Sequence, residues 1–184
     1  MSAHGNPTKG YSHMPVLCDE AIFYLNIKKG GRYVDGTFGM GGYASRILEA
    51  ANCELFAIDR DPAVFSTALN LSEKYGEKFV PLQGCFGNMD KLLFKHGIQK
   101  VDSIVLDLGV SSIQLDDPSR GFSFRYDGPL DMRMGQCGLT AGEVVNSMAE
   151  QDLANIIYTL GEERHSRRVS RAIVEARGNH PISS

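Results

Sequence analysis

Apolar segments that alternate with helical stretches constrain the fold of this sequence more than any other feature. Short strands are predicted at residues 31–35, 54–59, 78–82 and 101–107. Helical spacing of apolar residues follows the first two strands. Parallel strands need long crossover connections, usually helices, and such sheets are covered on both faces. We therefore predict an α/β fold with a Rossmann-like sheet of about four parallel strands.

The composition and the periodicity of the sequence change after Gly109. Residues 111–142 are rich in Ser, Gly, Asp and Pro and show no clean period, whereas helical spacing returns from Ala141. A last, Arg-rich helix is predicted at about 162–176. We therefore divide the chain into a Rossmann-like part, residues 1–110, and a loop with a mainly helical part, residues 111–184.

Composition excludes several classes of protein. The 184 residues carry a net charge of −3, so the chain as a whole is not a basic nucleic-acid-binding protein. Any RNA contact must come from a local basic patch. No apolar run approaches the roughly 18 residues that a membrane span needs. The four cysteines form no C-x-x-C pair, which argues against a zinc module. Residues 1–13 hold neither an apolar signal region nor an Arg-rich presequence, so the chain as written is expected in the cytoplasm.

A glycine loop at residues 35–42 lies between a predicted strand and a predicted helix. Glycines let the backbone turn sharply and approach a ligand, and free N–H groups at a helix start suit an anion. Gly39, Gly41 and Ala44 match the dinucleotide fingerprint G-x-G-x-x-G/A. The pattern fits either a nucleotide site or a purely structural turn.

Three acidic residues follow predicted strands and are expected on one rim of the sheet. Asp59 stands 18 residues after Gly41, where a carboxylate can accept both hydroxyls of a ribose, although a solvated loop acid is the alternative. Asp35 and Asp107 end two further strands. No histidine accompanies the acids, so no metal site is predicted. An acidic rim suits the cationic sulfonium of S-adenosylmethionine better than the pyrophosphate of NAD, and a nucleotide-dependent oxidoreductase is the more distant interpretation.

Seven blocks of the sequence resemble the RsmH/MraW family, with the closest likeness to its vertebrate mitochondrial branch, methyltransferase-like protein 15. The blocks are HMPVL at 13–17, DGTFGMGG at 35–42, AIDRD at 57–61, LDLGVSSIQLD at 106–116, RGFSF at 120–124, DGPLDMRM at 127–134 and GEER at 161–164. The resemblance implies a class I methyltransferase sheet followed by part of a helical insert. It also implies transfer of a methyl group from S-adenosylmethionine to N4 of a cytosine in small-subunit rRNA, and a mitochondrial location in that branch.

The resemblance implies seven cofactor-binding residues: Gly41, Gly42, Tyr43, Asp59, Phe86, Asp107 and Gln114. Asp59 would take the ribose hydroxyls and Phe86 would lie against the adenine. Asp107 and Gln114 would complete the pocket near the methionine end and the target base. The bacterial pattern usually has His where Tyr43 stands. Asp107 could accept a hydrogen bond from the cytosine amine, but no catalytic residue is assigned.

Two groups of residues are candidates for contact with RNA. Arg164, Arg168 and Arg171 fall on one face of the predicted last helix and could neutralise phosphates, or could form local Glu–Arg pairs on a solvated helix. The aromatic residues of the loop at 122–126 could stack on a base or pack within the loop.

Members of the family continue well beyond the point that corresponds to Ser184. We therefore expect a truncated copy of the enzyme, in which a strand order like 3-2-1-4-5 lacks its fifth strand. Residues 104–106 would then form an open apolar edge through which copies of the chain could associate. Two functions follow: an rRNA methyltransferase, or a catalytically inactive remnant that keeps only affinity for the cofactor or RNA.

Overall fold

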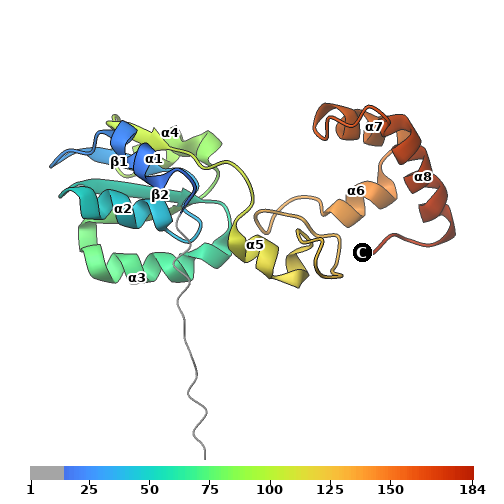
Figure 1. Cartoon of the computed structure of the whole chain (residues 1–184), viewed down its shortest axis with the longest axis horizontal. Coiled ribbons are helices and arrows are strands. Elements are labelled where there is room, and N and C mark those ends of the chain that lie inside the picture. The colour runs from blue at the N-terminus through green and yellow to red at the C-terminus, as the bar shows by residue number, and fades with distance from the viewer. Residues whose placement is uncertain (1–14) are drawn as a thin grey trace, which may run out of the picture. The chain divides into compact units, whose positions relative to one another are not determined.

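The computed structural model describes residues 15–184. The prediction about targeting segments in residues 1–13 therefore lies outside the described residues. The chain forms two compact units, and the boundary along the sequence falls between Leu108 and Gly109 (Figure 1). Within the described part of the chain, no helix is both long enough and apolar enough to cross a membrane.

The first unit is built on a four-stranded sheet in the order β3-β2-β1-β4 (Figure 1). Its strands are β1 (Arg32–Asp35), β2 (Glu54–Asp59), β3 (Phe79–Gln83) and β4 (Ser103–Val105). All three strand pairs are parallel. The observed sheet confirms the predicted α/β fold, and its strands occur in the expected order. The apolar strands β1 and β2 lie at the centre because neighbours cover both their edges and helices cover their faces.

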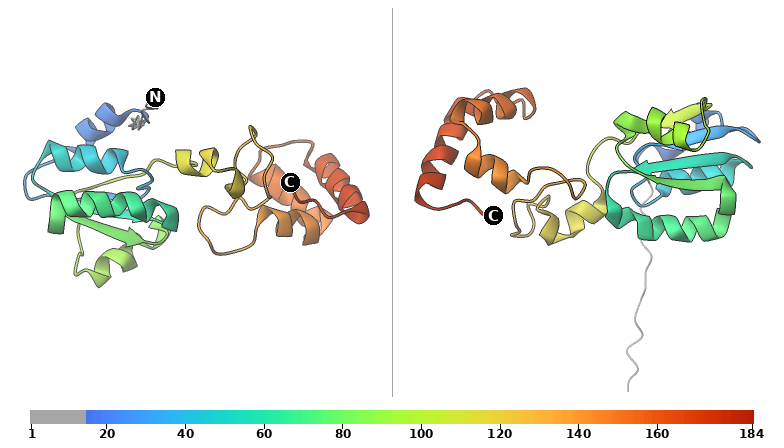
Figure 2. Two further views of the ribbon diagram at one scale, coloured as in Figure 1. Left: turned by 90° about the horizontal axis from the view of Figure 1, so that it is seen from below. Right: turned by 180° about the vertical axis from the view of Figure 1, so that it is seen from behind.

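Helices cover both faces of this sheet. They are α1 (Cys18–Leu25), α2 (Gly42–Ala50), α3 (Phe65–Tyr75) and α4 (Met89–Lys95), with short 3-10 turns η1 (Pro62–Val64), η2 (Gly76–Lys78) and η3 (Phe86–Asn88). Leu93 of α4 packs against Val34, Phe56 and Ile58, which alternate along the central strands toward one face. Helix α3 lies on the opposite face (Figure 2). Neither α1 nor α4 was predicted from the sequence.

Strand β4 lies at one edge of the described sheet and is shorter than the predicted segment 101–107. Only Ser103–Val105 pair with β1. Ile104 is 44% exposed and Leu106 is 41% exposed. The apolar edge expected from the sequence is therefore present in the described chain, while association through it stays a prediction.

The second unit is helical. Its elements are α5 (Ser112–Asp116), η4 (Pro118–Arg120), α6 (Ala141–Ser147), α7 (Glu150–Thr159) and α8 (Ser166–Asn179). Helices α7 and α8 pack together, and three of their buried side chains, Ala154, Ser166 and Ser170, are small. These small side chains allow the two helices to approach closely.

The last helix begins later than predicted. It starts at Ser166 rather than at residue 162, because the chain turns after α7, where Glu162 has a φ of 53°. A left-handed backbone conformation at a non-glycine residue does not continue a right-handed helix. Arg164 therefore lies in the turn before α8 and not on the helix face predicted for it.

Candidate functional site

The glycine loop begins at the carboxyl end of β1 and leads into α2. The Phe38 N–H donates to the Ile58 carbonyl at 3.1 Å, which ties the loop to the neighbouring strand β2. Gly41 precedes the first residue of α2 with a φ of 75°. A Cβ atom at Gly41 would lie 2.9 Å from the ring of Phe38 and 3.0 Å from Leu71. The loop thus needs glycine here both for its backbone conformation and for close packing.

We expect Gly41→Ala to lower the free energy of unfolding by more than Gly30→Ala. Both glycines have a φ of 75°, but a Cβ at Gly30 would meet nothing within 4 Å. Gly30→Ala therefore measures the left-handed backbone strain alone, about 1–2 kcal/mol. Urea unfolding of the two variants checks this expectation, and equal losses would contradict close packing at Gly41.

Asp59 ends β2 and is held by backbone donors. Its Oδ2 accepts from the Gly39 N–H at 2.8 Å, and its Oδ1 accepts from the Asp61 N–H at 2.9 Å. Its backbone carbonyl accepts from the Gly84 N–H at 2.8 Å. The carboxylate is partly exposed, and each oxygen keeps further acceptor capacity. Asp59 therefore joins the glycine loop to the loop after β3 and remains able to accept hydrogen bonds from a ligand.

The segments that follow β1, β3 and β4 meet at Gly36. Its N–H donates to the Val105 carbonyl at 3.0 Å. A Cβ atom at Gly36 would lie 2.4 Å from a methyl carbon of Leu106 and 3.3 Å from the Cβ of Phe86. The half-buried Phe86, which was predicted to contact adenine, thus begins η3 beside the glycine loop.

Asp107 is exposed and follows β4 at the same end of the sheet. Its backbone N–H donates to the Thr37 Oγ1 at 2.7 Å, which fixes the segment after β4 to the glycine loop. The carboxylate itself remains available to solvent or to a ligand.

Asp35 is the buried member of the acidic group. Its Oδ1 accepts from the Thr37 N–H at 3.1 Å, whereas its Oδ2 is buried without a hydrogen-bond partner among the described residues. The pKa of Asp35 is raised to about 7, chiefly by burial; the Asp59 and Asp107 carboxylates add to this rise, and the backbone hydrogen bond from Thr37 opposes it. The three acids predicted for one rim therefore lie close enough to affect one another. The sequence placed Asp35 at this rim but gave no sign of its burial.

Tyr43 and Gly42 belong to the first turn of α2. The Tyr43 ring is buried, and its hydroxyl donates to the Val16 carbonyl at 2.5 Å. Burial raises the pKa of this hydroxyl. Tyr43 therefore holds the segment before α1 against α2, and contact of Tyr43 or Gly42 with a cofactor stays a prediction.

Gln114 lies in the second unit, where its carboxamide has structural partners. It is 5% exposed, and its side chain accepts from the Ser111 N–H at 3.0 Å while Ser111 Oγ accepts from the Gln114 N–H at 3.3 Å. This capping box begins α5, and the Gln114 Nε2 also donates to the Met134 carbonyl at 3.3 Å. Contact of Gln114 with a cofactor therefore stays a prediction.

Of the three arginines predicted for one face of the last helix, Arg168 and Arg171 belong to α8, and Arg164 lies in the turn before it. Arg171 lies 3.7 Å from the Glu150 carboxylate, and Arg177 donates to the Val145 and Met148 carbonyls, at 2.8 Å each. In the aromatic loop, Phe124 is fully exposed and does not pack within the loop, whereas Phe122 is half-buried. Stacking of these residues on a base stays a prediction.

The described residues contain no group of three or more His, Cys, Asp or Glu side chains that could hold a metal ion. Asp35 and Asp59 accept hydrogen bonds from the backbone of the glycine loop, and the Asp107 backbone donates to Thr37 of the same loop. Such a rim can accept hydroxyl donors through Asp59, and the exposed Asp107 carboxylate favours a cation nearby.

Known proteins share much of this sequence. The sequence model of the MraW methylase family matches residues 10–184. The chain is 53% identical over 171 residues to the ribosomal RNA small subunit methyltransferase H of Rhodospirillum centenum, covering 93% of this chain and 52% of that protein. It is 51% identical over 175 residues to the protein of the same name from Acidiphilium cryptum, covering 95% and 56%. The chain thus spans about half the length of the curated relatives it matches.

Solved structures include a more distant likeness. The crystal structure of an rRNA methylase from Streptococcus thermophilus aligns with a TM-score of 0.41 and 18% identity, over 49% of this chain and 53% of that one.

Proposed function

This chain belongs to the MraW methylase family, and from that premise we propose that its first unit binds S-adenosylmethionine in a methyltransferase acting on N4 of a cytosine in small-subunit rRNA. The single observation that carries the proposal is the carboxylate of Asp59, held at the glycine loop by the Gly39 and Asp61 N–H groups. The names of the bacterial relatives support the rRNA substrate. The vertebrate mitochondrial branch stays a prediction.

The acidic rim fits this donor in two respects. The ribose hydroxyls can donate to the free lone pairs of Asp59, as in other nucleotide-binding α/β folds. The sulfonium is cationic, and the partly exposed Asp59 and the exposed Asp107 place two carboxylates at this rim. A pyrophosphate would instead meet repulsion from the same acids. The donor would supply the methyl group.

The remaining task of the protein is to position the cytosine amine. This amine is a poor nucleophile because its lone pair is delocalised into the ring. The exposed carboxylate of Asp107 can accept a hydrogen bond from it and help localise the lone pair, while alignment of the reacting atoms supplies much of the acceleration.

Thermal unfolding with and without S-adenosylmethionine tests the proposal. At about 100 times its Kd the donor should add roughly 2.7 kcal/mol to the free energy of unfolding, whereas NAD should add little. Methyl transfer to an rRNA fragment then measures activity. A cooperatively unfolding chain that S-adenosylmethionine does not stabilise would contradict the proposal, and stabilisation without transfer would indicate the inactive remnant.

A further inference from the structure

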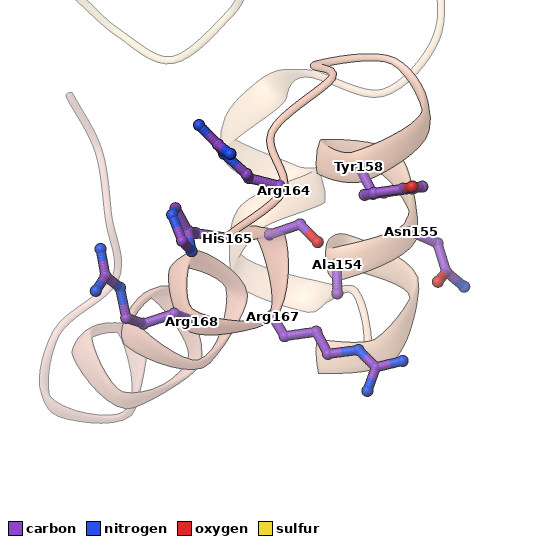
Figure 3. Close-up of a pocket in the computed structure, with 8 residues that line it drawn as sticks. Ala154, Asn155, Tyr158, Arg164, His165, Arg167 and Arg168 are labelled. Atoms are coloured by element: carbon purple, nitrogen blue, oxygen red, sulfur yellow. The ribbon is translucent and has the colours of Figure 1, made fainter.

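A pocket in the second unit lies between α7 and the start of α8 (Figure 3). Its volume is about 400 Å³. The lining includes Tyr158 of α7, and Arg164, His165, Arg167 and Arg168 from the turn before α8 and its first residues. Three arginines and a histidine thus line one pocket.

The turn that separates α7 from α8 produces this gathering. Because Glu162 adopts a φ of 53°, Arg164 and His165 lie outside the helix and beside its first turn. The Glu163 carboxylate accepts from the His165 backbone N–H at 2.6 Å, which fixes the turn. In Figure 3, Arg164, His165 and Arg168 project to the same side of the start of α8, and Arg167 projects to the other side.

The three arginines of the pocket differ from most others in the described chain. Arg32, Arg46, Arg133 and Arg171 each lie within ion-pair distance of a carboxylate. Arg164, Arg167 and Arg168 are exposed and make no side-chain hydrogen bond or ion pair among residues 15–184. Each guanidinium offers five N–H donors, so the pocket presents many donors and concentrated positive charge with no acidic partner.

We propose that this pocket is a phosphate-binding subsite for single-stranded RNA, an inference that rests on the proposed rRNA substrate. Arg164 and Arg168 each bind one phosphodiester of the strand, because a guanidinium fork matches phosphate oxygens in a bidentate manner. Tyr158, which is 62% exposed, offers its ring to a neighbouring base. An acidic peptide could use the arginines but would have no comparable use for the aromatic ring.

The test measures binding of a short fluorescein-labelled single-stranded RNA to the full chain by anisotropy at several salt concentrations. We expect Arg164→Gln/Arg168→Gln to weaken binding by at least about tenfold, since hydrogen bonds to charged groups are lost. The slope of log affinity against log salt should fall in magnitude by about 1.4, or about 0.7 for each phosphate contact removed. Tyr158→Leu should weaken binding with little change in this slope.

A matched control is Lys91→Gln/Lys95→Gln, which removes the same charge from exposed positions on α4. This control should leave affinity within about twofold of the parent. An unchanged salt slope in the arginine variant, absence of RNA binding by the parent, or equal competition by polyglutamate would each overturn the subsite. Calorimetry with S-adenosylmethionine, run on the same samples, reports separately on the proposed function, because a parent that binds RNA but not the donor contradicts only the latter.

Discussion

Asp59→Ala is expected to weaken binding of S-adenosylmethionine by at least about a hundredfold. The substitution removes the acceptor for two ribose hydroxyls, and a hydrogen bond to a charged group contributes about 1.5–3 kcal/mol. It also leaves the Gly39 and Asp61 N–H groups without their acceptor, so the glycine loop loses a support. Isothermal titration calorimetry measures the affinity directly.

Two further variants separate these effects. Asp59→Asn keeps one oxygen for the backbone donors but removes the charge, and should lose less affinity than Asp59→Ala. Glu73→Ala, on the exposed side of α3, removes a carboxylate away from the loop and should bind as the parent does. Retention of full affinity in Asp59→Ala would place the ribose elsewhere in the first unit.

Asp35→Asn is expected to remove a large pH dependence of stability. The folded pKa of Asp35, about 7, lies above the ordinary value of 3.8, chiefly because the carboxyl is buried. Between these values the unfolded chain has lost the proton while the folded chain keeps it. The free energy of unfolding therefore falls as pH rises from about 4 to about 7. At about 1.4 kcal/mol for each pH unit, the loss approaches roughly 4 kcal/mol.

Urea unfolding followed by circular dichroism measures this contribution. Between about pH 4 and pH 8, the free energy of unfolding of Asp35→Asn should rise by several kcal/mol relative to that of the parent. Glu73→Gln, which removes an exposed carboxylate, provides the matched comparison. Parallel pH profiles for Asp35→Asn and the parent would show that Asp35 does not retain its proton in the folded state.

The sequence predicted the sheet well because apolar strands and the turns between them are local patterns. Residues 54–59 form β2 as expected, and the acids at the ends of β1 and β2 lie where parallel strands must place them. The glycine loop was found for the same reason. The pKa of Asp35 depends on its burial and on the Asp59 and Asp107 carboxylates, which follow other strands. A local sequence pattern shows neither of these.

The second unit was harder to predict because its contacts are long in range and its helices are short. The five-residue helix α5 was missed, although Ser111 and Gln114 carry the spacing of a capping box. Helical periodicity put Arg164 on the last helix, but the turn at Glu162 excludes it. The same periodicity could not show that Arg171 faces Glu150 on α7.

The hydrogen bonds around Asp59 affect the rate and the entropic cost of ligand binding. Gly39 and Gly84 donate to Asp59, and Asp107 donates to Thr37, so groups of the protein itself hold this carboxylate and the adjoining loop. The acceptor that we propose for the ribose is therefore preorganised, and ordering of the loop would not have to accompany association. Conformational entropy lost on binding then falls mainly on the flexible ligand and little on the protein.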